Sequence, residues 1–74
     1  MIAWYELNYY QIDTLIEILD DPLLLESITE NDWYINFVKG IRYDIIRKKC
    51  ISEKQLYQIK KLAAFNKIPW TLSI

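Results

Sequence analysis

Two signals for the start of a helix coincide at Ser52, and together they constrain the fold more than any other feature of the sequence. Ser52 and Gln55 have the spacing of a capping box, in which each side chain binds a free backbone amide of the other residue. Ile51 and Leu56 have the spacing of a hydrophobic staple, which fixes the angle at which the chain enters the helix. These residues predict a helix over 53–66.

This helix is expected to be amphipathic. Its apolar residues recur at the spacing of one helix face: Leu56, Ile59, Leu62 and Ala63. The opposite face carries cations and aromatic rings: Lys54, Tyr57, Gln58, Lys61 and Phe65. Asn66 and Pro69 indicate the end of the helix, because Asn tolerates a left-handed cap and the residue before a proline avoids helix. We therefore expect a buried apolar face and an exposed basic and aromatic face.

Two more helices are predicted in the first part of the chain. Asn8 and Gln11 form a second capping box, and the helix that it starts has an apolar stripe consisting of Ile12, Leu15, Ile16 and Leu19. Asp21 and Pro22 end this helix and can begin another, because Asp is a favoured cap and Pro is accepted at the first helical position. A short helix or turn should then cover 22–28, with candidates for the core in Leu23, Leu24 and Leu25.

A longer helix is predicted over 30–49, with a cap signature at Thr29 and Asp32 and with cations at its end, where the helix dipole favours them. One broad face is apolar: Trp33, Tyr34, Phe37, Val38, Ile41 and Ile45. The other face carries Asn36, Lys39, Tyr43 and Arg47. Gly40 interrupts the helix, and we expect it to mark a close helix crossing or a bend.

The remaining segments connect and flank the helices. Residues 49–52 are too few for anything but a tight connection, so the last two helices should form a hairpin or a corner. Residues 68–74 alternate between apolar and polar side chains, which is typical of a half-buried strand, and 1–5 form either a strand or an ordered tail. The sequence thus predicts one all-α domain over 1–74, a compact bundle of three to four short helices, with the two termini as candidates for pairing as a small ribbon.

Composition limits what can stabilise the fold and what chemistry is available. A chain of 74 residues buries a limited share of its surface, so help from tight packing, a partner or self-association is expected. A single cysteine, Cys50, and the lack of histidine argue against an internal disulfide, a structural zinc site and the usual general base. Adjacent Asp20 and Asp21 are interpreted as a turn residue and a cap, and Cys50 as a packed thiol. We expect no catalytic residue, metal or cofactor.

No apolar run approaches the length that spans a bilayer, and the start of the chain lacks the pattern of a signal peptide, so a cytoplasmic protein is expected.

Charge is divided along the chain. Residues 1–37 contain eight Asp and Glu and no Lys or Arg, whereas residues 38–74 contain nine Lys and Arg and two Asp and Glu, giving net charges of −8 and +7. Such a division indicates contact with nucleic acid, contact with a charged partner, or pairing of the two halves with each other.

The two basic helices offer a candidate binding surface. On both, cations that can contact phosphate alternate with flat rings on which bases can stack. The alternative is structural, with lysine stems covering apolar edges, tyrosine rings partly buried and the cations paired with the acidic half. The candidate binding residues are Lys39, Tyr43, Arg47, Lys54, Tyr57, Lys61 and Phe65.

One sequence pattern resembles a known type of module. Trp33, Phe37, Val38 and Ile41, followed by the stretch 51–59, form the pattern W-x-x-x-F-V-x-x-I and then I-S-x-K-Q. It resembles a short helical segment that recurs in phage and mobile-element proteins associated with DNA metabolism. The resemblance covers less than half of the chain. It implies a helical hairpin and a phage-type origin, and leaves the target open.

These sequence features suggest two functions of different classes. The first is a small non-enzymatic, phage-type accessory or inhibitor protein that docks on a protein or nucleoprotein machine of nucleic-acid metabolism or host defence. Its charged halves and aromatic residues favour this hypothesis, because one complementary patch with a few aromatic anchors suffices for tight binding. The second is direct nucleic-acid binding through the helix pair 30–49 and 53–66.

Overall fold

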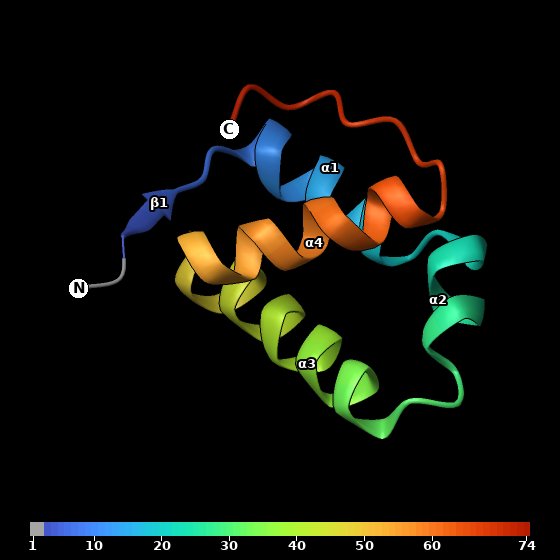
Figure 1. Ribbon diagram of the computed structural model, residues 1–74. Coiled ribbons are helices and arrows are strands. Elements are labelled where there is room, and N and C mark those ends of the chain that lie inside the picture. The colour runs from blue at the N-terminus through green and yellow to red at the C-terminus, as the bar shows by residue number, and fades with distance from the viewer. Residues whose placement is uncertain (1–2) are drawn as a thin grey trace.

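A computed structural model describes residues 3–74 and shows four α-helices arranged around one core, within an envelope of 30 × 23 × 21 Å (Figure 1). This confirms the predicted fold class, a compact bundle of short helices with a small ribbon. In chain order the elements are β1 (Trp4–Glu6), α1 (Tyr9–Leu19), α2 (Pro22–Ile28), α3 (Asp32–Tyr43), the π-helical turn η1 (Asp44–Lys48), β2 (Cys50–Ser52) and α4 (Glu53–Phe65).

Both predicted capping boxes are present, which explains where α1 and α4 begin. At α1 the Asn8 side chain accepts a hydrogen bond from the Gln11 amide at 2.8 Å, and the Gln11 side chain accepts one from the Asn8 amide at 2.9 Å. At α4 the corresponding distances between Ser52 and Gln55 are 3.1 and 3.0 Å. The Gln55 amide group also donates to Asp44 at 2.9 Å, so this cap fastens α4 to η1.

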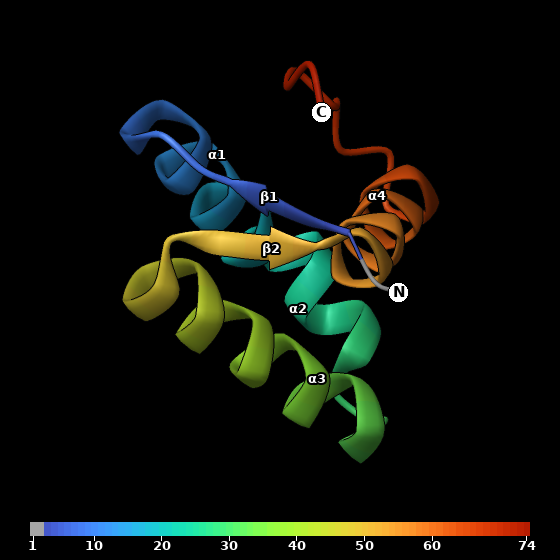
Figure 2. The ribbon, with the colours of Figure 1, turned by 90° about the vertical axis from the view of Figure 1, so that its left-hand side faces the viewer.

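The ribbon differs from the predicted one in its second strand. β1 pairs with β2 in antiparallel register, Trp4 opposite Ser52 and Glu6 opposite Cys50 (Figure 2). The prediction that the two termini pair is therefore wrong, and the connection predicted over 49–52 contains a strand. Residues 68–74 form no strand, yet their side chains alternate inward and outward, with Leu72 buried. The alternation predicted which side chains face the core, but strand formation also needs a neighbouring backbone. Met1 and Ile2 lie outside the described residues.

The third helix is shorter than predicted. Asn31, not Thr29, caps α3, accepting a hydrogen bond from the Tyr34 amide at 3.2 Å. Thr29 instead ends α2, where its hydroxyl donates to the Leu25 carbonyl at 2.9 Å. At the other end, the α-helix stops at Tyr43, the π-helical turn η1 follows, and Lys49 adopts a left-handed conformation with φ of 55° that turns the chain into β2.

The core is built from branched aliphatic side chains of every helix and of β2. Those with almost no exposed surface are Leu15, Leu19, Leu24, Ile41, Ile45, Ile51 and Ile59. Three residues predicted to be in the core are exposed instead: Leu23, Leu25 and Trp33. The reason in α2 is geometric, because a helix of seven residues presents one stripe inward, and here that stripe consists of Leu24 and Ile28 at a spacing of four.

Gly40 lies in the middle of α3 without a neighbour that requires a glycine, so the expectation of a close helix crossing is wrong. A Cβ atom built at this position meets nothing within 4 Å, and the backbone has no positive φ. We predict that Gly40→Ala raises the free energy of unfolding by about 0.5 to 1 kcal/mol, because alanine loses less conformational entropy in a helix. Urea denaturation followed by circular dichroism measures this change, and a loss of stability would contradict it.

Candidate binding surface

Two hollows open between side chains of α3 and α4, one beside β1 and the start of α4, the other beside α2 and the end of α4. The first, of about 500 Å³, is lined by Trp4, Trp33, Phe37, Ser52, Lys54, Gln55 and Gln58. The second, of about 250 Å³, is lined by Ser27, Ile28, Asn31, Tyr34, Lys61, Leu62 and Phe65. The adjacent rings of Trp33 and Tyr34, with centroids 4.9 Å apart, connect the two. We call these two hollows together the α3–α4 seam.

Exposed aromatic rings are the main feature of the seam. Trp33 stacks on Phe37, with ring centroids 5.1 Å apart and planes inclined by 9°, and it meets Tyr34 edge to face at 85°. Trp33 nevertheless keeps 60% of its surface exposed, Trp4 keeps 52% and Phe65 keeps 78%. Trp4 and Trp33 line the first hollow and Phe65 lines the second, so each hollow has a large aromatic ring in contact with water. Exposed apolar surface of this kind marks interaction sites.

Local structure explains how Trp4 and Lys54 come to lie together. The register of the ribbon sets Trp4 opposite Ser52, the residue that caps α4. The Glu53 amide donates to the Ala3 carbonyl at 2.8 Å, which extends this pairing into the first turn of α4. The indole of Trp4 and the first lysine of α4 therefore line the same hollow.

Some of the Lys and Arg side chains in the described residues form ion pairs or lie over aromatic rings, and the others do neither. Within residues 3–74 the ion pairs are Arg42 with Asp20, and Lys48 with Asp44 at 3.4 Å. Further cations lie over rings: Arg47 over Tyr43 at 5.9 Å, Lys49 over Tyr9 at 5.4 Å, and Lys60 over Trp70 at 5.5 Å. In the described part of the chain, Arg42 is thus the one cation of the basic half that pairs with the acidic half, so most of the charge division is not cancelled internally.

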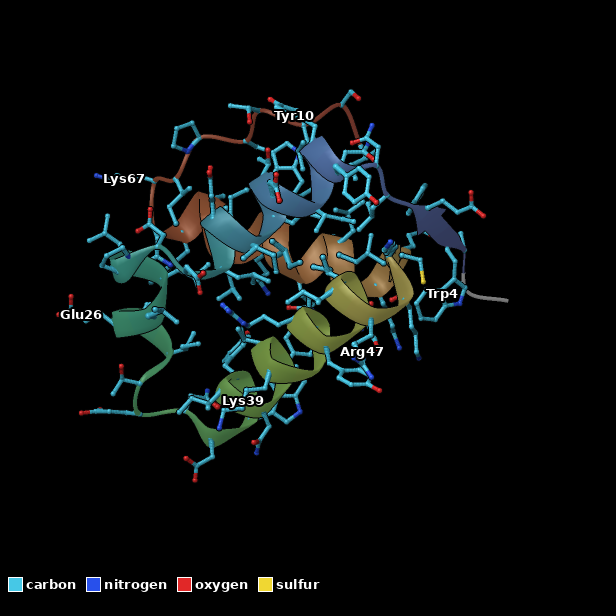
Figure 3. The ribbon with its side chains drawn as sticks, turned by 180° about the vertical axis from the view of Figure 1, so that it is seen from behind. Trp4, Tyr10, Glu26, Lys39, Arg47 and Lys67 are labelled. Atoms are coloured by element: carbon cyan, nitrogen blue, oxygen red, sulfur yellow. The ribbon has the colours of Figure 1, made fainter. Side chains whose placement is uncertain are left out.

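Of the seven predicted binding residues, the structure brings three together at the seam: Lys54, Lys61 and Phe65. Tyr57 is exposed on another side of α4, in a hollow with Tyr5 and Ile74. Lys39 lies at the opposite flank of α3, beside α2. Tyr43, at the end of α3, contacts Arg47 of η1. Figure 3 shows Lys39 and Arg47 at separate places along α3 and η1. The two basic stripes therefore occupy separate surfaces.

Sequence reasoning missed Trp4, Trp33, Phe37 and Gln58 as site residues. The spacing of Trp33 and Phe37 predicts a core position, because they share one helix face with the other apolar residues of α3. They lie at the edge of that face, where the helix turns from Val38 and Ile41 toward solvent. The position of Trp4 depends on pairing with a strand about fifty residues away in the sequence, a contact that no local pattern predicts.

The seam presents side chains suited to binding. The adjacent carboxylates that could suggest catalysis have structural roles instead. Asp20 pairs with Arg42, and Asp21 caps α2 by accepting from the Leu23 amide at 2.9 Å. Within 3–74, no three metal-binding side chains are grouped to hold an ion. None of the helices in that range has the length and apolar character needed to cross a bilayer. Comparison with models of known protein families, with curated proteins and with solved structures finds no match to this chain.

Proposed function

We propose that this chain is a small non-enzymatic binding protein, of a phage-type accessory or inhibitor class, that docks through the α3–α4 seam on a protein or nucleoprotein machine of nucleic-acid metabolism or host defence. The observation that carries the proposal is the exposure of Trp4, Trp33 and Phe65 at one seam. Tryptophan is among the residues that contribute most to binding energy at protein interfaces.

The arrangement of the seam suits a protein partner. Trp33 is held by its contacts with Phe37 and Tyr34, so little side-chain freedom remains to be lost on binding. Lys54 and Lys61 stand on α4 at a spacing of seven residues and supply polar, charged positions beside the rings. An apolar centre with a polar rim is the usual anatomy of such interfaces. The partner's matching surface should therefore be apolar in its middle and acidic at its edge.

Direct binding of single-stranded nucleic acid is the second candidate, and the first hollow of the seam favours it. There Lys54 and Gln58 stand beside the rings of Trp4 and Trp33. Rings that accept stacked bases, next to a cation that contacts phosphate, form the usual surface for such strands. The two candidates predict different behaviour toward salt and nucleic acid.

Salt titration distinguishes them. If the seam binds protein, labelled oligothymidylate should show no change in fluorescence anisotropy even at about 50 mM salt, where phosphate contacts are strong. If it binds a single strand, affinity should fall steeply toward about 200 mM, and the double variant Lys54→Gln/Lys61→Gln should reduce the logarithmic salt slope by about 1.4, roughly 0.7 for each lost phosphate contact. Lys39→Gln/Lys67→Gln, which removes the same charge outside the seam, serves as control.

The result would decide between the two functions. Binding with a slope that the seam variant flattens and the control does not would overturn the docking proposal in favour of nucleic-acid binding. Binding that both variants weaken equally would indicate nonspecific attraction to positive charge, and would remove the seam from the nucleic-acid hypothesis.

A further inference from the structure

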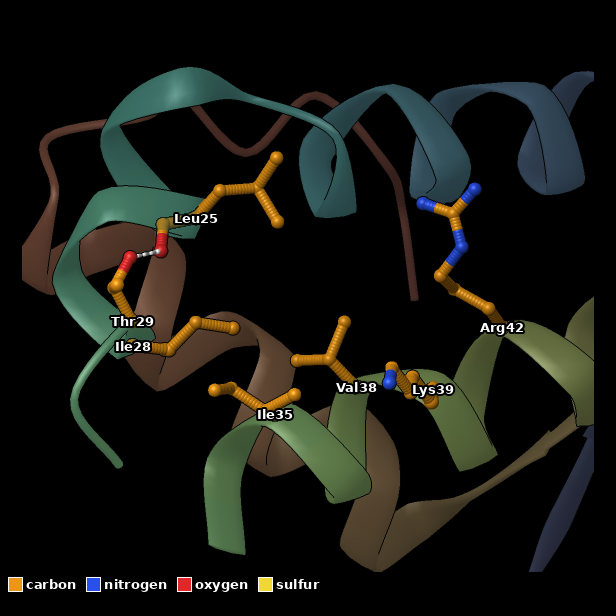
Figure 4. A pocket seen from close by; sticks show the side chains of 7 residues that line it. All are labelled: Leu25, Ile28, Thr29, Ile35, Val38, Lys39 and Arg42. Carbon is orange, nitrogen blue, oxygen red and sulfur yellow. Dashed lines mark hydrogen bonds between the residues drawn. The ribbon is translucent and has the colours of Figure 1, made fainter. Parts of the chain in front are cut away.

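A separate cleft lies between α2 and α3, on the flank of α3 opposite the seam (Figure 4). It measures about 410 Å³, within the range of small-ligand pockets. Its floor is formed by the buried Ile28 and Val38, and its walls by the less buried Leu25 and Ile35. The Thr29 hydroxyl donates to the Leu25 carbonyl at 2.9 Å, as the dashed line in the figure marks, so the polar group at this end already has a partner.

Two cations stand at the other end of the cleft. Lys39 and Arg42 follow Val38 on α3 and line the cleft with it. Arg42 pairs with Asp20, at the end of α1, and Lys39 has no ion pair within residues 3–74. The Asp20 side chain keeps 51% of its surface exposed, so the ion pair is open to water and to competing anions. The cleft therefore combines an apolar floor with positive charge at one edge.

We propose that the α2–α3 cleft binds a small apolar anion, a hydrocarbon or aromatic group that carries one carboxylate. The apolar group would cover Ile28 and Val38, which gains hydrophobic free energy, while the carboxylate stays at the edge near water and contacts Lys39. A carboxylate there also competes with Asp20 for the charge-assisted hydrogen bonds of the Arg42 guanidinium. The cleft shares the buried Ile28 with the second hollow of the seam, but this proposal does not depend on the function proposed for the seam.

The ion pair at the edge makes the site testable by two variants with opposite effects. Lys39 is the cation of the cleft that has no ion pair within residues 3–74. Lys39→Gln should weaken binding roughly two- to fivefold, the range of one partly exposed charge contact. Asp20→Asn releases Arg42 from its partner in the protein and should tighten binding roughly twofold. Lys67→Gln, which removes an exposed lysine that lines neither the cleft nor the seam, should leave binding unchanged.

The probe is 4-phenylbutyrate, compared with its uncharged amide of the same shape, 4-phenylbutyramide. We expect millimolar binding of the carboxylate in a titration followed by amide nuclear magnetic resonance, with the largest shifts in α2 and between Ile35 and Arg42 of α3. The amide should bind several-fold more weakly. Equal affinity of the two compounds would overturn the role of the cations, as would an Asp20→Asn variant that binds no better than the original chain.

The location of the shifts provides a further check that does not depend on the variants' stability. Shifts centred on Trp33 and α4 would place the compound in the seam and overturn the assignment to the cleft. No saturable shift up to solubility would overturn the proposal altogether. Each variant is first compared with the original chain by its amide spectrum, so that a change in affinity is read from a folded protein.

Discussion

Replacing Leu24 with alanine is expected to lower the free energy of unfolding by about 3 kcal/mol, within the range measured for leucine truncation in protein cores. Leu24 has no exposed surface and lies in the core that α2 shares with the other helices. A domain of 74 residues has a total stability of only about 4 to 11 kcal/mol on a per-residue basis. Leu24→Ala should therefore remove a large part of the stability, which urea denaturation at 25 °C measures.

The neighbouring leucine provides the matched control. Leu23 keeps 57% of its surface exposed, and Leu23→Ala changes the same chemical group one position along the same helix. Its effect should stay within about 0.5 kcal/mol, as for most surface substitutions. Equal losses for the two variants would contradict the packing of α2 described above, because they would mean that both side chains or neither contribute to the core.

This pair of variants also marks a limit of what the sequence predicts. Leu23, Leu24 and Leu25 are chemically identical, and a helix of seven residues is too short for periodicity to indicate which one faces inward. Tertiary packing decides which leucine is buried, because it places Leu24 and Ile28 against the other helices. By contrast, the starts of α1 and α4 were predictable because the groups that cap them, such as Ser52 and Gln55, are local in sequence.

The same limit applies to the candidate site, where local patterns predict some residues and tertiary packing decides the others. Lys54, Lys61 and Phe65 are predictable because they recur on one face of a single helix, which a local pattern describes. For Trp33 the pattern predicts the core, because a large apolar ring beside an apolar stripe is usually buried. In the structure the Trp33–Phe37 stack instead faces an open hollow between α3 and the start of α4, and Trp33 stays 60% exposed. The packing of one element against another, and not the residue types, decides which aromatic rings become available for binding.

Trp33 is accordingly the residue whose removal should affect binding most. Trp33→Ala is expected to weaken capture of the protein partner by about 2 kcal/mol or more, close to thirtyfold, the usual effect of truncating an aromatic anchor at the centre of an interface. The cost in folding stability should be smaller, about 0.5 to 1.5 kcal/mol, because within the chain the exposed Trp33 ring packs mainly on the Phe37 and Tyr34 rings. Capture of partners from a host-cell lysate by the immobilised chain, followed by dissociation constants for the captured protein, measures the effect.

Tyr43 supplies the control, because it keeps 58% of its surface exposed on the same helix but lies over Arg47, outside the seam. Tyr43→Ala removes a similar exposed ring and should change the dissociation constant less than about twofold, as expected for a residue outside the contact area. If Tyr43→Ala abolished capture while Trp33→Ala preserved it, docking would occur at the end of α3 and not at the seam. If both variants bound as well as the original chain, neither aromatic surface of α3 would contact the partner, and the docking proposal would lose the observation that supports it.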